Sequence, residues 1–523
     1  MRNNILPSAK VDKVQDVGQL SGRLSDYAKL SLLALAFQGS MPLMAAEEPP
    51  IGQINDYLRI TGELRGRYEA YDFFQPALNP AKGITANNND YSFGGIRARV
   101  GVALTSPYVD GFVQGQYSGV YGIPGDTFAG LPVGPLGLGG AYLRDSGSTD
   151  PGTVFVRQAY VNFKTAPWGL PGGALKAGRF EIADGLEYKT GDAKFDGLKT
   201  SRVSQRLIGP FDFTYVNRSF DGFSLNYDHA DYNVKLDATH PTQGGFNVHG
   251  QQEISNIDLF YAALTSKRNT WLPGTEERLF YVYYGDQRNN VMPVDSRPLP
   301  MRPSLSAKGL QIHTVGTHVL SVVPVGTGSV DSLLWGAYQF GDWGNLNHQA
   351  YALDAEVGYQ WTQVPLKPWV RAIYYRGSGD SNAKDNTHET FFQVLPTVRA
   401  YAKFPFFNMM NIQDAFVQLN VSPTSTTKVG IDMHYLALTN KEDLFYGGAG
   451  ATSKMGGLGY FGRASGGNST VGEMVDLTFT HNLTKELSWS AYYAHAFGDD
   501  ATRSAYQLKN DADFGFVEVN LSI

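Results

Sequence analysis

Arginine and carboxylate side chains alternate with apolar residues in one stretch near the start of the chain, YLRITGELRGRYEAYD. Arg59, Arg65 and Arg67 share one parity with Glu63 and Glu69. In a β-strand, residues of one parity lie on one face, so these charges line a single surface. Guanidinium groups stay charged and bind carboxylates through paired hydrogen bonds. The pattern predicts either a relay for an anionic solute or a wall stiffened by cross-strand ion pairs.

Later alternating stretches carry arginines of the same kind. IRARVGVAL contributes two of them, and LKAGRFEI and PWVRAIYYRG contribute others. If the apolar parity of each strand faces lipid, the opposite parity lines a lumen. The arginines that we expect to line a pore and select anions on this basis are Arg59, Arg65, Arg67, Arg97, Arg99, Arg179 and Arg371.

The motifs of other chemistries are missing from the sequence. It has no Walker phosphate-binding loop, no dinucleotide-binding glycine motif and no HExxH, and its histidines lack zinc-site spacing. DSNAKDNTHE begins like a calcium loop, but Lys384, Asp385 and Phe391 stand where that motif needs an acid or amide, a glycine and a glutamate. We therefore expect no enzyme, no metal site and no cofactor.

The composition indicates an all-β protein. Of 523 residues, 42% are hydrophobic and 13% aromatic, with 59 glycines, a mixture that is atypical of helical or disordered chains. The chain has no cysteine, which excludes disulfides and thiolate sites. A net charge of −6 disfavours nucleic acid as a partner.

The N-terminal region resembles a secretory signal. Basic residues precede the apolar run LSLLALAF, and the small pair Ala45 and Ala46 follows it, as at a cleavage site. We expect a signal peptide over 1–46, a short periplasmic segment over 47–56 and one barrel domain over 57–523. No other stretch approaches the roughly 18 apolar residues of a membrane-spanning helix.

Short and long connections alternate along the remainder of the chain. Eight short turns join alternating segments in pairs, and irregular stretches separate the pairs. The short turns lie at 108–111, 166–173, 229–232, 266–277, 324–332, 364–368, 422–428 and 482–487, and the longer connections include 120–153, 285–308, 377–410 and 440–471. Sixteen paired strands with the first and last give about eighteen, arranged as a membrane-spanning antiparallel up-and-down β-barrel with short periplasmic turns and long extracellular loops.

The C-terminal strand supports a closed barrel. FGFVEVNLSI alternates to the last residue, Ile523, and an unpaired edge strand of this kind would aggregate. We expect it to pair with the strand that begins near Tyr57. We also expect it to be the signal that the outer-membrane assembly machinery reads, although such signals usually end in an aromatic residue and Ile523 departs from that.

One longer stretch carries a family resemblance. GRFEI, RLIGPFDF and NRSFDG within residues 177–227, with NIQDAFVQLNVSPT and HYLALTNKEDLFY later, resemble segments of the alginate-export family of outer-membrane proteins. The resemblance implies an eighteen-stranded porin whose positively lined channel passes an anionic polysaccharide by passive diffusion. It also implies that Arg179, Arg206, and Arg218 with Asp221 lie near the constriction. The connections at 120–153 and 285–308 depart from the family pattern.

Three functions remain open from the sequence. The first is a porin-like channel in the bacterial outer membrane for anionic or polyhydroxylated solutes, with membrane lipids and a sugar-like solute as partners. The second is a barrel that forms a scaffold or sheath for a periplasmic electron-transfer or polymer-secretion complex. The third is a barrel-embedded hydrolase, for which no Ser–His pair stands out.

Overall fold

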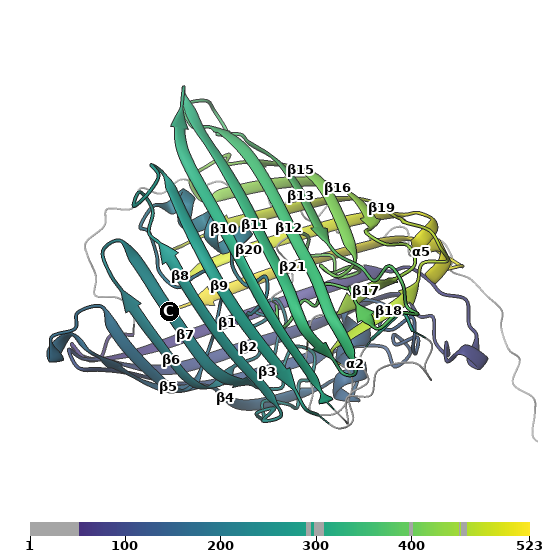
Figure 1. Ribbon diagram of the computed structural model, residues 1–523, viewed down its shortest axis with the longest axis horizontal. Helices are drawn as coiled ribbons and strands as arrows, with labels where there is room; N and C mark the ends of the chain where they lie inside the picture. The colour runs from purple at the N-terminus through teal and green to yellow at the C-terminus, as the bar shows by residue number, and fades with distance from the viewer. Residues whose placement is uncertain (1–51, 289–293, 298–307, 397–400, 449, 451–457) are drawn as a thin grey trace, which may run out of the picture. The chain divides into compact units, whose positions relative to one another are not determined.

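The computed structural model describes residues 52–288, 294–297, 308–396, 401–448, 450 and 458–523 (Figure 1). The expected signal peptide at 1–46 lies outside these residues, and of the expected segment 47–56 only 52–56 are described. The wall strands are β1 (Leu58–Asp72), β2 (Asp90–Thr105), β3 (Val109–Tyr121), β4 (Gly152–Lys164), β5 (Gly173–Phe180), β6 (Phe220–Asp228), β7 (Tyr232–Pro241), β8 (Ile257–Ser266), β9 (Thr275–Asp286), β10 (Leu310–Val325), β11 (Gly328–Trp343), β12 (Leu346–Trp361), β13 (Trp369–Gly377), β15 (Ile412–Val421), β16 (Thr427–Leu438), β19 (Thr470–Asn482), β20 (Leu487–Gly498) and β21 (Asp511–Ser522).

These strands form a closed antiparallel barrel. The main sheet has 19 strands, and without the two-residue β14 (Thr387–His388), which lies in a loop, eighteen form the wall. β1 pairs with β2 on one side and with β21 on the other. The last residue extends this pairing, because Ile523 N donates to Gly62 O over 2.8 Å and Gly62 N donates back over 3.0 Å. The terminal strand therefore closes the barrel, as the sequence predicts.

The two faces of the wall follow the sequence parity. On β1, Ile60, Leu64 and Tyr68 are exposed, whereas Arg65 and Arg67 on the other parity are buried. The same alternation continues around the wall, and it is the pattern of a barrel with lipid outside and polar groups inside.

The connections differ in length at the two ends of the barrel. All eight predicted short turns lie at one end, including the two-residue turn 326–327 between β10 and β11. The other end carries the long connections, with one exception. Residues 344–345 join β11 directly to β12, because Gly344 adopts the positive φ of 63° that a tight hairpin turn needs. The predicted alternation is confirmed everywhere except at this turn.

The long connections contain short helices and one additional hairpin. The elements are η2 (Pro80–Lys82), α2 (Leu138–Ser146), α3 (Ala193–Leu198), η4 (Lys199–Val203), α5 (Asp500–Ala505) and the pair β17 (Leu444–Gly448) and β18 (Tyr460–Ala464), while η3 (Ala166–Trp168) lies in a short turn. No helix among the described residues is long and apolar enough to cross a membrane. The loops pack aromatic side chains against one another and against the inner wall, as Phe404 does against Phe514 of β21.

Candidate functional site

One long connection crosses the interior of the barrel. Residues 181–219, here called the crossing segment, leave β5 and return to β6, and in between they contact β1, β2 and β3 and also β12. The segment contains α3, which begins where the Asp192 carboxylate accepts a hydrogen bond of 2.9 Å from Phe195 N. An Asp at this position satisfies a free amide of the first helical turn. The crossing segment is thus an ordered element that joins separate parts of the wall.

The first attachment of the crossing segment is to the arginines of β1 and β2. Arg65 Nη1 donates to Asp212 O over 2.7 Å, and Arg67 Nη1 donates to the next carbonyl, Phe213 O, over 3.0 Å. Arg97 Nη1 binds the Asp212 carboxylate over 2.8 Å. The backbone between Phe211 and Asn217 turns its carbonyls toward the wall, and both of these residues have positive φ, 59° and 67°.

Asp212 is the acid at the centre of this attachment. The surrounding protein removes part of the water from its carboxyl, which raises the pKa, but attraction to Arg97 and Arg99 outweighs this effect and holds the pKa well below its usual range. Its side chain remains 52% exposed, so it faces open space while it binds the arginines. The carboxylate is therefore charged throughout the physiological pH range.

The same arginines also bind acids of the wall. Arg67 Nε donates to Glu518 of β21 over 2.6 Å, and Glu63 accepts from Arg97 Nε over 2.8 Å and from Arg99 Nη1 over 2.9 Å. These pairs are the cross-strand arrangement that the sequence left open beside the anion relay. Arg65, Arg67, Arg97 and Arg99 are buried on the inner face of the wall, and their guanidinium groups are engaged with acids and with the crossing segment.

The second attachment is a buried ion network on β11, β12 and β13. Arg202 of η4 donates to Glu356 over 2.8 and 3.0 Å, and Arg206 pairs with both Glu356 and Asp354. Although burial opposes it, Asp354 raises the pKa of Arg206 above its ordinary value. Arg371 of β13 completes the network.

Arg371 joins two acids of this network. It donates to Glu356 over 2.6 Å and to Asp331 of β11 over 2.9 Å. Lys194 of α3 lies 3.3 Å from the same Asp331. Buried charges of this kind are stable only when each has partners, because an unpaired one costs several kcal/mol. The two attachments hold the crossing segment between distant parts of the wall.

Arg179, Asp221 and Arg59, which the sequence also predicts as site residues, lie away from these two attachments. Arg179 pairs with Asp221 over 2.6 and 2.7 Å. Its partner in the sheet register is Ala159 of β4, which lies two residues before the exposed Val161 and therefore on the same face of that strand. This ion pair is on the outer face near the loop end, because the strand alternation continues through Gly178, and it is not at a constriction. Arg59 is exposed at the end of β1 that carries the short turns.

Arg218, which the resemblance places near the constriction, is enclosed by the loops. It is 1% exposed, lies over the Phe211 ring, and donates to Pro396 O over 3.5 Å. Burial lowers its pKa to about 10. Its position inside the packed loops indicates a role in holding them together.

The sequence-based list lacks two fully buried arginines of the wall, Arg278 of β9, which lies 3.3 Å from Glu187 of the crossing segment, and Arg157. Arg157 of β4 binds Glu181 over 2.6 Å and also contacts Ser219, at the two ends of the crossing segment. The register of β3 against β4 shifts here, with Gln114 opposite Gln158 and Gly115 opposite Val156. Arg157 is the extra residue of this bulge, and a bulge reverses the parity of the strand beyond it. The sequence contains a sign of this bulge. In TVFVRQAYVNF the exposed apolar residues are even-numbered before Arg157 and odd-numbered after it.

Two lysines that sequence reasoning also missed face the interior without an acid. Lys176 Nζ of β5 lies 4.4 Å from the centroid of the Tyr160 ring. Lys403 Nζ lies 5.5 Å from the ring centroids of Tyr492 and Phe516. Burial, and next Arg67, lower the pKa of Lys403. Within the described part of the chain, neither ammonium group has a carboxylate at ion-pair distance.

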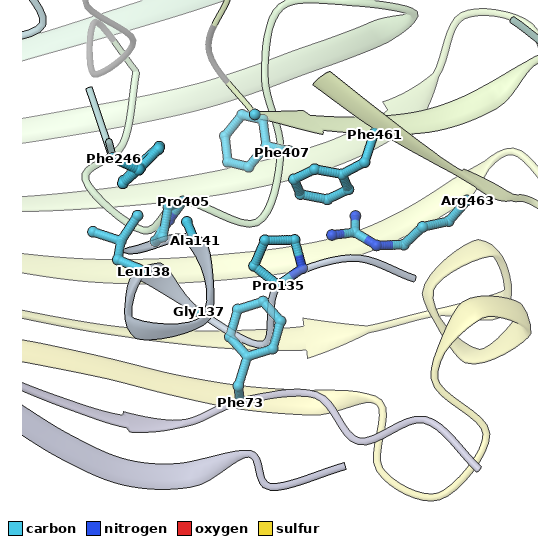
Figure 2. Close-up of a pocket in the computed structure, with 11 residues that line it drawn as sticks. Phe73, Pro135, Gly137, Leu138, Ala141, Phe246, Pro405, Phe407, Phe461 and Arg463 are labelled. Carbon is cyan, nitrogen blue, oxygen red and sulfur yellow. The ribbon is translucent and has the colours of Figure 1, made fainter. Parts of the chain in front are cut away.

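The long loops converge around a small cavity of about 30 Å³. Figure 2 shows Phe407 and Phe461 on one side of it, Phe73 and Pro135 on another, and Arg463 at its edge. The residues come from five different connections, and a volume of this size holds about one water molecule. A sugar-sized solute does not fit at this point of the loop cluster.

Comparison with known proteins agrees with this geometry. The sequence profile for alginate export matches residues 135–515. Among solved structures, the chain is similar to the outer membrane protein OpdK from Pseudomonas aeruginosa, with 9% identity, a TM-score of 0.52, and coverage of 89% of this chain and 98% of that one. OccK9 (OpdG) from Pseudomonas aeruginosa gives 10% identity and a TM-score of 0.55 over 89% and 98% of the two chains.

OccAB2 from Acinetobacter baumannii gives 8% identity and a TM-score of 0.54, with 90% and 98% covered. At these identities the likeness concerns the fold. No curated protein matches the sequence.

The closed barrel and its charged interior define a porin-like channel of the bacterial outer membrane. The chain belongs to the alginate export family. Barrels of this family are transport channels, and membership therefore places the chain with transport proteins.

Proposed function

We propose that the protein is a passive channel for anionic or polyhydroxylated solutes, of which an acidic polysaccharide or oligosaccharide is the leading class. Family membership supports export or diffusion of a polyuronate, whose repeating unit carries one carboxylate and several hydroxyl groups. The observation that carries the proposal is the pair of interior lysines, Lys176 and Lys403, which have aromatic rings beside them and, among the described residues, no acid at ion-pair distance.

An ammonium group without a partner carboxylate can bind a passing anion without first breaking an ion pair. The ring of Tyr160, which is only partly buried, offers beside Lys176 a flat apolar face of the kind on which sugar rings stack. The paired arginines contribute differently. Arg65, Arg67, Arg97, Arg99, Arg206 and Arg371 set the position of the crossing segment and hence the width of the path, while Arg59 at the short-turn end lies at the periplasmic mouth.

The test is ion conductance of the refolded protein in a planar bilayer under a salt gradient. We expect an anion-preferring reversal potential, and we expect acidic oligosaccharides to block the current more strongly than neutral ones of equal length. Lys176→Met and Lys403→Met should each shift the reversal potential toward zero. Lys428→Met, at the exposed short-turn end of β16, is the matched control and should change it little.

A cation-preferring current would refute the anionic channel. A folded barrel that conducts nothing and purifies with a stoichiometric partner would instead favour the scaffold.

A further inference from the structure

Three side chains on neighbouring strands of the inner wall point their ligand atoms at one another. Asp432 and His434 lie on β16 and Asp476 lies on β19, the adjacent strand (Figure 1). One ligand atom from each of the three lies within 4.8 Å of the others. Asp432 and Asp476 are direct register partners, so two carboxylates face each other across the strands. Like charges at directly opposite positions destabilise a sheet unless a cation lies between them.

His434 supplies a second and independent observation. Its Nδ1 is hydrogen-bonded to the Asp414 carboxylate over 2.9 Å, which fixes the ring proton on that nitrogen. Its Nε2 is buried, has no hydrogen-bond partner in the part of the chain that the structure describes, and lies 3.9 Å from Asp476 Oδ2. The whole residue is 3% exposed, and its ring stacks on Phe416 at 4.2 Å. The Nε2 atom of the imidazole is therefore held in place beside the two carboxylates.

We propose that Asp432, His434 and Asp476 form a binding site for a divalent transition metal, of which Zn²⁺ is the leading case. Imidazole and carboxylate ligands together suit zinc and its neighbours, whereas Ca²⁺ and Mg²⁺ prefer oxygen alone. Donor atoms around a zinc ion at about 2.1 Å lie within about 4.2 Å of one another, so small side-chain rotations close the site.

The surroundings of the three ligands match those of known metal sites. A metal-binding histidine normally donates its other ring N–H to a carboxylate, and Asp414 occupies that position here. The carboxylate ligands are themselves oriented by donors. Gln418 Nε2 donates to Asp432 Oδ2 over 2.9 Å, and the Tyr492 hydroxyl donates to Asp476 Oδ2 over 3.0 Å. A carboxylate oxygen that accepts one hydrogen bond still has a lone pair for a metal, so both aspartates remain able to bind one.

The site has an entry path and open coordination positions. Asp432 is only partly buried, so the ligands are reached from the interior of the barrel. Three protein ligands leave at least one position of a zinc ion for water or for another oxygen ligand. The metal joins β16 to β19 and offsets the charge of the facing aspartates. The sequence does not reveal this site, because its ligands belong to two strands that are joined by a long connection.

The experiment is a Zn²⁺ titration of the full-length refolded barrel in detergent after treatment with a chelator, followed by calorimetry. We expect one Zn²⁺ per chain and much weaker binding of Ca²⁺ and Mg²⁺. Titration with Co²⁺ gives a direct readout, because its visible absorption bands report coordination by nitrogen and oxygen in a defined geometry.

His434→Gln and Asp476→Asn should each weaken Zn²⁺ binding by at least about 100-fold. Asp414→Asn should weaken it by about 10- to 100-fold, since it acts through the histidine. The matched control is His240→Gln, which removes a histidine 3.5 Å from Asp258 on the outer wall and should leave the stoichiometric site intact.

Two results would overturn the proposal. One is the absence of stoichiometric Zn²⁺ binding in the folded wild-type barrel, in which case His434 is a cation that pairs with Asp414 and Asp476. The other is unchanged affinity in folded His434→Gln or Asp476→Asn. If these variants do not fold, Asp432→Asn provides the same comparison at a partly exposed position.

Discussion

The Arg67 guanidinium of β1 donates to the Glu518 carboxylate of β21 over 2.6 Å, across the seam where the first and last strands close the barrel. The two residues are also direct register partners, so the ion pair fixes the register of the seam. Their side chains are only 4% and 12% exposed, and such a pair resists screening by salt more than one at the surface does.

The seam pair should contribute to barrel stability. Arg67→Met leaves the Glu518 carboxylate with Arg65 at 3.8 Å and the Asn520 amide at 2.8 Å, and we expect a loss of about 3 kcal/mol in the free energy of unfolding. Urea titration in detergent, monitored by the heat-dependent gel mobility of the folded barrel, measures it. Arg59→Met is the matched control and should stay within about 0.5 kcal/mol. The double variant Arg67→Met with Glu518→Leu should recover most of the loss, and failure to recover would show that the pair is not the cause.

The crossing segment should loosen when its second attachment is cut. Arg206→Met leaves Asp354 buried without its guanidinium partner. We expect amide hydrogen exchange of α3 and η4 to accelerate at least tenfold and the ion current to become noisier. Lys189→Met, at an exposed position of the same segment, is the control. Unchanged exchange in Arg206→Met would mean that the other contacts of the segment, such as Lys199 with Glu276 over 2.9 Å, are enough to hold it.

The loop cluster should respond to pH through Asp443. Burial raises the pKa of this carboxyl to about 6, although Thr390 and Tyr446 donate hydrogen bonds to it over 2.6 and 2.7 Å. Because the folded-state pKa is above the unfolded value, the stabilisation is complete below pH about 4 and is lost as the pH rises through about 6.

We therefore expect the amides of β17 and β18 to exchange faster at pH 7.5 than at pH 5, after correction for the intrinsic rate. Asp443→Asn should remove this difference. A pH dependence that persists in the variant would assign it to another group.

The aromatic loop cavity should limit the current. Phe461→Ala removes a ring from a cavity of about 30 Å³ where five connections meet, and we expect a higher single-channel conductance. Phe340→Ala, on the outer face, removes an equal volume without touching the path and should leave conductance unchanged. Equal conductance in Phe461→Ala and the wild type would place the ion path elsewhere.

Local sequence determined the wall of the barrel. Strand alternation is a property of neighbouring residues, so the inward positions of Arg65, Arg67, Arg97, Arg99 and Arg371, the strand number and the eight short turns could all be predicted. The apolar parity of the last strand likewise required a partner, and β1 supplies it. Prediction from local pattern failed at the Arg157 bulge, where the alternation is interrupted, and at Arg179, which shares the outward parity of Leu175.

Only the tertiary structure decided what the charges do. Whether a lumen-facing arginine is paired depends on a segment about 115 to 150 residues away that folds back across the barrel, as Asp212 does to Arg65 and Arg97. The same holds for Asp432 and Asp476, which meet only because β16 and β19 are neighbours in the closed sheet. Contacts between distant parts of the chain leave no period in the sequence, whereas the pleat of a strand does.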